Sequence, residues 1–275
     1  MRLALWIAIG ATWAFSTGAS AAERIAIVIG NAGYQHVGEL RNPVNDANLV
    51  SNALRGLGFQ VYDHRNLTAS ALEEALIAFV EEADRAGPDA LILFFYAGHG
   101  IQIADENYLV PVDADPSTTL RLRSQAYGLN EYMRNVANTK AKYSIVILDA
   151  CRNNPFVTDN RATTRGLARV EEEAASDIQT YIMFSTGPGQ VAADGSGPNS
   201  DFSAAFAANL RPGTTIDDIG AEVSVAVTIR PDRSRGFPTA CRITLCSRPD
   251  PRRLNPQNRR ERLHPSQHVT LRRKQ

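Results

Sequence analysis

Cysteine is scarce in this sequence, with three residues among 275, and three cannot cross-link a chain of this length into a disulfide scaffold. Long apolar runs are scarce too, since the single one lies at the extreme N-terminus, and this excludes a protein with several membrane-spanning helices. Hydrophobic residues make up 44% of the chain and charged residues 21%, a composition that excludes wholesale disorder. The chain is therefore expected to bury a large core, in one large domain or two small ones.

Lysine is as scarce as cysteine, with three residues against 26 arginines. The formal net charge is zero, but residues 230–275 carry thirteen basic and three acidic side chains, which leaves the preceding chain at a net charge of −10. Two interpretations of this Arg- and Pro-rich tail stay open. One is a disordered tail that binds an anionic surface or nucleic acid, a partner not expected for the acidic body. The other, which the arginine excess favours, is an aberrant sequence read in a shifted frame of a GC-rich gene.

Residues 1–22 are typical of a secretory signal peptide, with a basic start, an apolar stretch from Leu3 to Phe15 and then small residues. Cleavage is expected after Ala21 or Ala22. An uncleaved anchor is the alternative, although the apolar stretch is short for a bilayer core of roughly 30 Å. The mature protein is expected in the periplasm or outside the cell, without a transmembrane segment once the signal is removed.

Apolar runs that alternate with helical periodicity predict an α/β fold. Strands are expected at residues 24–30, 59–64, 90–96, 143–148 and 180–184, helices at 43–57, 69–86, 130–138 and 200–210, and a hairpin at 101–110 with its turn at 105–107. Asn42 is expected to cap the first helix, with Pro43 at its first position. The alternation indicates one mostly parallel, doubly wound sheet with helices on both faces, formed by residues 23–229.

Two reactive side chains follow two of the apolar strands: His99 comes after the run at 90–96, and Cys151 after the run at 143–148. Ligands bind at the carboxyl ends of the strands in an open parallel sheet, so the two side chains lie within reach if these strands are neighbours. A thiol beside an imidazole is a nucleophile with its base. The backbone N–H groups of Gly100 and Cys151 are the expected donors to a developing oxyanion. The alternative is an inert buried thiol and a structural histidine.

Three blocks of sequence carry a family resemblance. They are Tyr96-Ala97-Gly98-His99-Gly100, Asn107-Tyr108-Leu109-Val110-Pro111-Val112-Asp113 and Leu148-Asp149-Ala150-Cys151-Arg152-Asn153-Asn154-Pro155-Phe156. These blocks resemble the caspase-like cysteine peptidases, and among them the bacterial metacaspase-type (orthocaspase) branch. The 52 positions from His99 to Cys151 fit the caspase signature. Residues 40–47, 185–189 and 193–195 support the resemblance, which covers residues 24–210.

The resemblance implies a caspase-hemoglobinase fold and hydrolysis of peptide bonds through a thioester, with Cys151 as nucleophile and His99 as general acid and base. Peptides or proteins would be the substrates. No cofactor is implied; some relatives use calcium, but the sequence has no D-x-D-x-D-G loop, and no metal site is predicted. Two other functions stay open: a caspase-like binding or scaffolding module without catalysis, and a different hydrolase or transferase that uses the same thiol.

Asp149, two residues before Cys151, indicates which substrate residue is preferred just before the cleaved peptide bond. By resemblance, true caspases carry Gln at this position and cleave after Asp, whereas the metacaspase-type branch carries Asp. A carboxylate in a pocket is costly to desolvate unless a cation meets it, so cleavage after Arg or Lys is expected. Asp194 lies in a loop that resembles the pocket wall of the family and is the second expected carboxylate. Alternatively, Asp149 only orders the strand end by accepting backbone amides.

The linker between the strand before Cys151 and the strand that begins at Thr180 contains Arg161, Arg165 and Arg169 among small and polar residues. Such a composition is typical of an exposed loop that proteases can cut. The resemblance to relatives that mature by cutting this loop predicts self-processing after one of these arginines. A simple surface loop is the alternative.

Overall fold

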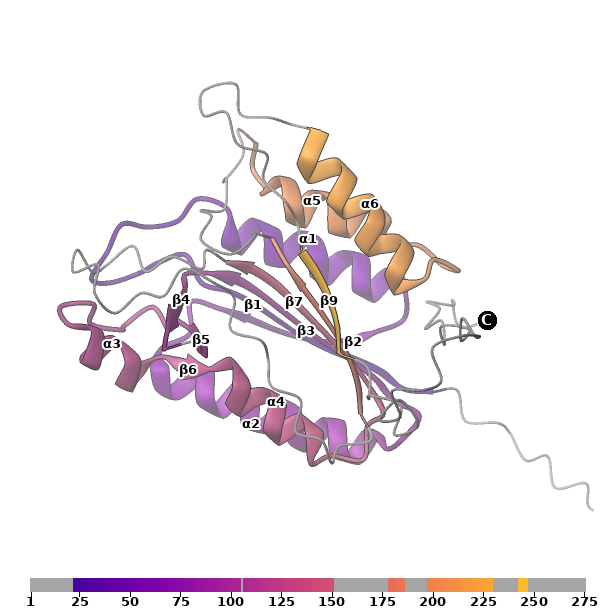
Figure 1. Cartoon of the computed structure of the whole chain (residues 1–275), viewed down its shortest axis with the longest axis horizontal. Helices are drawn as coiled ribbons and strands as arrows, with labels where there is room; N and C mark the ends of the chain where they lie inside the picture. Colours follow the sequence, from indigo (N-terminus) through magenta and orange to yellow (C-terminus); the bar gives the residue numbers. More distant parts are fainter. Residues whose placement is uncertain (1–21, 105, 151–177, 186–196, 230–241, 247–275) are drawn as a thin grey trace, which may run out of the picture.

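The centre of the molecule is a six-stranded sheet in the order β2-β1-β3-β7-β8-β9 (Figure 1). The computed structural model describes residues 22–104, 106–150, 178–185, 197–229 and 242–246. The strands of the sheet are β1 (Arg24–Gly30), β2 (Gln60–Arg65), β3 (Leu91–Gly98), β7 (Tyr143–Ala150), β8 (Gln179–Phe184) and β9 (Arg242–Cys246). Neighbouring strands are parallel except β8 and β9, which are antiparallel.

Helices cover both faces of this sheet (Figure 1). On one face lie α1 (Pro43–Gly56), α5 (Asp201–Asn209) and α6 (Ile216–Ile229), and on the other α2 (Ala69–Ala86) and α4 (Leu129–Ala137). Successive strand residues divide between two cores: Val28 and Phe95 pack on the α1 side, Ile27 and Phe94 on the α2 side. The predicted α/β class, a mostly parallel and doubly wound sheet, is confirmed.

Local chemistry differs between the starts of α1 and α2. At the start of α2, the Thr68 hydroxyl accepts a hydrogen bond from the Ala71 amide at 3.4 Å, and Gly87, with φ of +83°, ends the helix. Asn42 occupies the predicted N-cap position of α1, before Pro43, and its carbonyl accepts a hydrogen bond from the Asp46 amide, but its side chain makes no capping hydrogen bond. Asn42 already has helical backbone angles, whereas a capping residue is usually extended.

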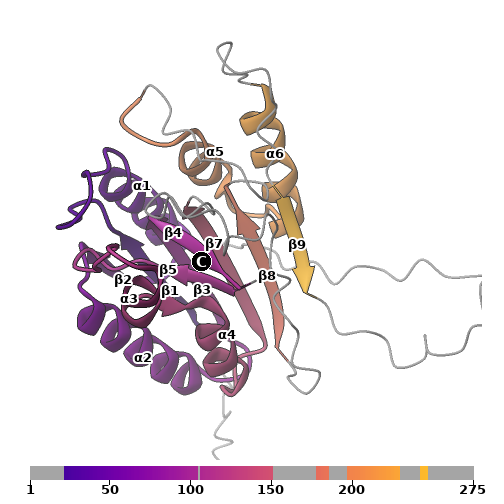
Figure 2. The same cartoon turned by 60° about the vertical axis from the view of Figure 1, so that its left-hand side comes forward.

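A small second sheet follows His99, seen from another side in Figure 2, in the order β4-β5-β6. β4 (Gly100–Ile103) and β5 (Glu106–Leu109) form the predicted hairpin, and two elements without a sequence prediction, α3 (Thr119–Gln125) and β6 (Tyr127–Gly128), follow it. The predicted turn at 105–107 is wrong, since Asn107 belongs to β5 and pairs with Gln102. The turn includes Ala104, whose φ is +48°. The polar character of Asn107 suggested a turn, but its position in the sheet buries it.

The C-terminal part of the described chain contributes α6 and β9. β9 pairs with β8 along its whole length, from Thr180 opposite Cys246 to Phe184 opposite Arg242. A strand of the main sheet therefore lies within residues 230–275, where the sequence suggests a basic tail. Residues 230–241 and 247–275 lie outside the described residues, so both interpretations of that tail stay predictions.

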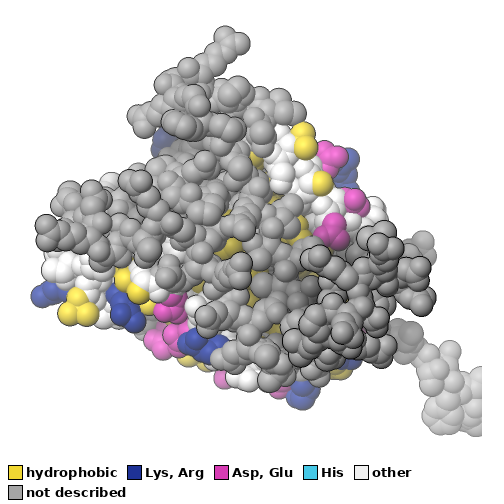
Figure 3. All heavy atoms as spheres, in the orientation of Figure 1, with side chains coloured by type: hydrophobic (Ala, Val, Ile, Leu, Met, Phe, Trp, Pro, Cys, Tyr) yellow, Lys and Arg dark blue, Asp and Glu magenta, His cyan; other side chains and the backbone are white. Residues whose placement is uncertain are grey.

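The described surface mixes charges of both signs. On the face seen in Figure 3, acidic and basic side chains of the described residues lie close to one another. Within the described ranges, no helix is both long and apolar enough to cross a membrane. Residues 1–21, nearly all of the expected signal peptide, lie outside these ranges.

Candidate active site

The two strands that precede the predicted catalytic pair are direct neighbours. β3 and β7 run parallel, and their last register pair joins Gly98 to Ala150. His99 and Cys151 are the next residues of the two chain segments, at the carboxyl edge where parallel sheets bind ligands. Cys151 itself lies outside the described residues. The condition on which the predicted dyad depends, that the two strands be neighbours, is fulfilled.

Of the other predicted site residues, the structure describes some and not others. Asp194, Arg161, Arg165 and Arg169 lie outside the described residues, and their roles stay predictions. Gly100 is buried and begins β4, where it pairs with Leu109. Gly100 comes directly after His99 in the chain. The role of its backbone N–H group in an oxyanion hole stays a prediction.

The imidazole of His99 packs against the ring of Tyr34, with 4.5 Å between the ring centroids and 53° between the planes. Burial lowers the pKa of His99 to about 4, because desolvation disfavours the charged imidazolium. The ring is therefore uncharged at neutral pH. A neutral imidazole is the form that accepts a proton, as a general base must.

Asp149 is buried and lies on the α1 face of the sheet, the face that Ile147 also occupies. Its Oδ2 accepts hydrogen bonds from the hydroxyl of Ser200 and from the hydroxyl of Ser203, the latter at 2.5 Å. Ser200 also caps α5, since its Oγ accepts a hydrogen bond from the Ser203 amide at 2.9 Å. The carboxylate thus lies at the N-terminus of a helix, where negative charge is stabilised.

A second buried carboxylate, which the sequence analysis did not single out, lies beside Asp149. Asp46 of α1 is 2% exposed, and its Oδ1 accepts hydrogen bonds at 2.9 Å from the Asn199 side chain and from the Ser200 amide. Ser200 therefore binds Asp46 through its amide and Asp149 through its hydroxyl. The two carboxylates converge on one residue.

A signal for Asp46 was present in the sequence. The buried stripe of α1 includes Asp46, Val50 and Leu54, which are spaced by four residues. This spacing places the aspartate on the apolar face of the predicted helix. Because charged residues are rarely buried without a specific role, an acid on that stripe is a candidate functional residue.

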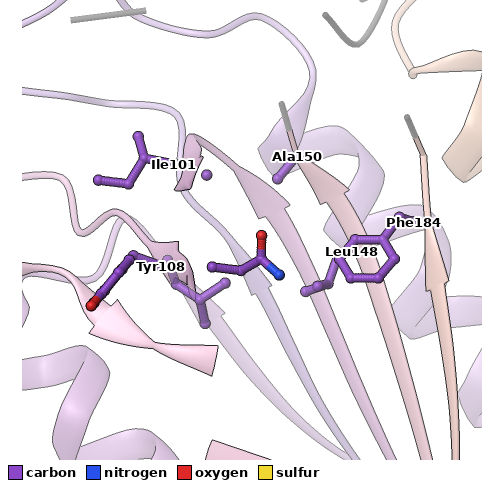
Figure 4. A pocket seen from close by; sticks show the side chains of 8 residues that line it. Ile101, Tyr108, Leu148, Ala150 and Phe184 are labelled. Atoms are coloured by element: carbon purple, nitrogen blue, oxygen red, sulfur yellow. The ribbon is translucent and has the colours of Figure 1, made fainter. Parts of the chain in front are cut away.

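A small cavity of about 20 Å³ lies between the hairpin and the ends of β7 and β8 (Figure 4). Its walls are formed by Gly100, Ile101, Asn107, Tyr108, Leu109, Leu148, Ala150 and Phe184. The cavity has room for about one water molecule. Within the described residues, the buried Asn107 side-chain nitrogen has no hydrogen-bond partner. Two of the lining residues, Gly100 and Ala150, are the neighbours in sequence of His99 and Cys151.

Comparison with known proteins identifies the family. A family model described as the caspase domain matches residues 23–249. The chain belongs to the caspase-domain family. The human protein "Mucosa-associated lymphoid tissue lymphoma translocation protein 1" is 29% identical over an alignment of 164 residues, and the match covers 55% of this chain and 20% of that protein. Caspase-1-B of Xenopus laevis is 24% identical over 173 residues, 58% of this chain and 42% of that protein.

Family membership confirms the resemblance to caspase-like peptidases. The matched segment is a fifth of the length of the human relative and less than half of the frog relative. No group of three or more His, Cys, Asp or Glu side chains in the described ranges is arranged to hold a metal ion.

Proposed function

We propose that this chain is a cysteine endopeptidase of the metacaspase type, with Cys151 as nucleophile and His99 as general acid and base, and that it cleaves after Arg or Lys. The observation that carries the proposal is the register of β3 and β7, in which Gly98 and Ala150 are partners. His99 and Cys151 continue these neighbouring strands at the edge where parallel sheets bind ligands. The caspase-domain match adds support.

The proposed chemistry has two halves. The neutral imidazole of His99 takes the proton of the Cys151 thiol as the sulfur attacks the substrate carbonyl carbon. The imidazolium gives this proton to the leaving amine, the C–N bond breaks and a thioester forms. Water then attacks the thioester while His99 accepts its proton and passes it to the departing thiolate. The N–H groups of Gly100 and Cys151 are proposed to bind the oxyanion that forms in both halves.

The preference for Arg or Lys is proposed to come from Asp149 together with Asp46. Both carboxylates are buried, and both bind Ser200. Two negative charges close together in a buried site favour an incoming cation, and a guanidinium pairs with carboxylates in bidentate fashion. The same charges repel an acidic side chain, so cleavage after Asp is not expected. Asp194 is proposed as a further carboxylate of this pocket.

A caspase-like binding module without catalysis is the competing function, and the reactivity of Cys151 separates the two. Alkylation of the protein with iodoacetamide should abolish turnover of a fluorogenic peptide, and Cys151→Ala should have the same effect. A binding module would keep its function when alkylated and would cut no peptide of a positional library. A different hydrolase or transferase would also cut none, although alkylation would abolish its own reaction. Turnover by Cys151→Ala would refute the dyad.

Export and self-processing complete the proposal. Residues 1–22 are proposed to direct the chain to the periplasm or out of the cell. The peptidase is proposed to cut itself after Arg161, Arg165 or Arg169, by the same basic preference. Intact-mass analysis should then show fragments for the wild type and a full-length chain for Cys151→Ala. Identical masses would rule out self-processing.

A further inference from the structure

We infer that Tyr34 is a positioning residue for His99: its buried hydroxyl holds the His99 backbone amide, and its ring holds the imidazole. The inference rests on the proposed function, in which His99 is the base. Tyr34 lies in the loop between β1 and α1, remote in sequence from His99. Its proposed effect on the reaction runs through His99, whose backbone amide and imidazole it contacts.

Two tyrosine hydroxyls hold His99 at both ends of its backbone. The His99 amide donates a hydrogen bond to the Tyr34 oxygen at 2.7 Å, and the Tyr96 hydroxyl donates to the His99 carbonyl at 2.9 Å. The two hydroxyls lie 3.4 Å apart and also approach the Val110 carbonyl, at 3.3 Å from Tyr34 and 3.0 Å from Tyr96. The backbone of the proposed base is thereby tied to the hairpin that follows it.

The side chain of His99 is held by the same residue. The Tyr34 ring lies 4.5 Å from the imidazole, centroid to centroid, and its tilted contact limits the rotation of the imidazole. Tyr34 therefore contacts both the backbone and the ring of His99.

The residue before His99 has a backbone conformation that brings the two tyrosine hydroxyls close to the chain. Gly98, directly before His99, has φ of +155°, a conformation that L side chains rarely adopt. A Cβ built on Gly98 would lie 2.8 Å from the hydroxyl oxygens of both Tyr34 and Tyr96. The glycine thus allows the two hydroxyls to approach the chain, and these in turn fix the turn that presents His99.

Tyr34 is itself held in place before any substrate arrives. The Asn66 side-chain oxygen accepts hydrogen bonds at 2.9 Å from the amides of Ala32 and Gly33, and the Gln35 amide donates to the Val112 carbonyl at 2.8 Å. Tyr34 is 8% exposed. Burial raises the pKa of its hydroxyl, so the group stays protonated and neutral at neutral pH.

Tyr34→Phe removes the hydroxyl oxygen and keeps the ring. The His99 amide then loses the acceptor of its 2.7 Å hydrogen bond. Because an unpaired amide is costly, we expect His99 to move from its position. We expect kcat to fall by about 10- to 100-fold with KM unchanged, because misplacement of a catalytic group affects chemistry more than substrate binding. Tyr34→Leu, which also removes the ring contact, should lower kcat further.

Tyr132→Phe is the matched control. Both tyrosines are buried, but the Tyr132 hydroxyl has no hydrogen-bond partner among the described residues. This variant should keep the wild-type kcat. Thermal midpoints of both variants, measured by circular dichroism, show how much of each preparation is folded. A Tyr34→Phe enzyme with wild-type kcat, or with a loss fully explained by its unfolded fraction, would overturn the inference.

The rate of Cys151 alkylation by iodoacetamide keeps this test separate from that of the proposed function. Cys151→Ala identifies the signal of this thiol against the other two cysteines. A misplaced base no longer assists the thiol, so the alkylation rate of Tyr34→Phe should fall toward that of His99→Ala. If the wild type cleaves no peptide, the proposed peptidase function fails, but the alkylation rates still decide the positioning role. Equal rates in wild type and Tyr34→Phe would overturn it.

Discussion

Asp46 and Asp149 come from distant parts of the chain, yet both bind Ser200. Asp46 accepts a hydrogen bond from the Ser200 amide at 2.9 Å, and Asp149 accepts one from the hydroxyl of the same residue. The first turn of α1, the end of β7 and the N-terminus of α5 therefore meet at one buried point. Asp149 comes two residues before the proposed nucleophile in the sequence, so we propose that the two carboxylates act together on the substrate.

Asp46→Asn and Asp149→Asn each remove one negative charge and keep the size of the side chain. Each should lower kcat/KM for an Arg-ended peptide by about 10- to 100-fold, since a hydrogen bond to a charged group contributes about 1.5–3 kcal/mol. Asp84→Asn is the control, because exposed Asp84 only pairs with Lys140 on the surface. Wild-type kcat/KM in both pocket variants would contradict the assignment of the pocket.

The pH dependence of activity should follow the protonation of the His99 imidazole. Because burial lowers its pKa to about 4, the imidazole stays uncharged at neutral pH and loses its capacity as a base only as the pH falls through that value. We expect kcat/KM to show an acid limb near pH 4. A limb centred near 6.5, the ordinary value, would contradict the buried, neutral base.

Folding has to be followed in the same pH range, since carboxylates also titrate there. Hydrogen bonds from Lys140 lower the pKa of Asp84, and the Ser117 amide lowers that of Asp115. Groups with a lowered pKa stabilise the fold above their unfolded-state pKa, and this contribution is lost as the pH falls through the folded-state value. Circular dichroism at each pH separates this loss of structure from the protonation of His99.

Gly98→Ala should damage both stability and activity. A Cβ at this position lies 2.8 Å from two buried hydroxyl oxygens, and φ is +155°. We expect the free energy of unfolding to fall by about 1–3 kcal/mol and kcat to fall with the displacement of His99. Gly38→Ala is the control, since a Cβ there meets nothing within 4 Å. Denaturant unfolding and peptide turnover that are the same in both variants would disprove this account of the turn.

The five parallel strands of the main sheet and α2 were predictable because their signals are local, whereas β9 lies in the Arg- and Pro-rich segment and was not predicted. Apolar runs such as the one in β3 predict buried strands, and α2 has regular apolar spacing between Thr68 and Gly87. The position of Asn107 was not predictable from polarity, because its burial depends on pairing with Gln102 across the hairpin.

The candidate site was predictable only in part. His99 follows an apolar strand, and the sequence marks such a residue as a candidate. The convergence of Asp46 and Asp149 on Ser200 depends on how α1, β7 and α5 pack, which no spacing in the sequence specifies. The support of His99 by Tyr34 is likewise a tertiary contact between segments far apart in the chain.

The central claim is tested most directly with two fluorogenic peptides that differ only in Arg or Asp before the cleaved bond. Initial rates are measured for the wild type, Cys151→Ala, His99→Ala and the double variant. The account predicts that the wild type cleaves the Arg peptide and not the Asp peptide. Either single substitution should remove nearly all of this activity, and the double variant should lose no more, because the two residues act as a unit. Faster cleavage of the Asp peptide by the wild type, or substantial turnover by Cys151→Ala, would contradict the account.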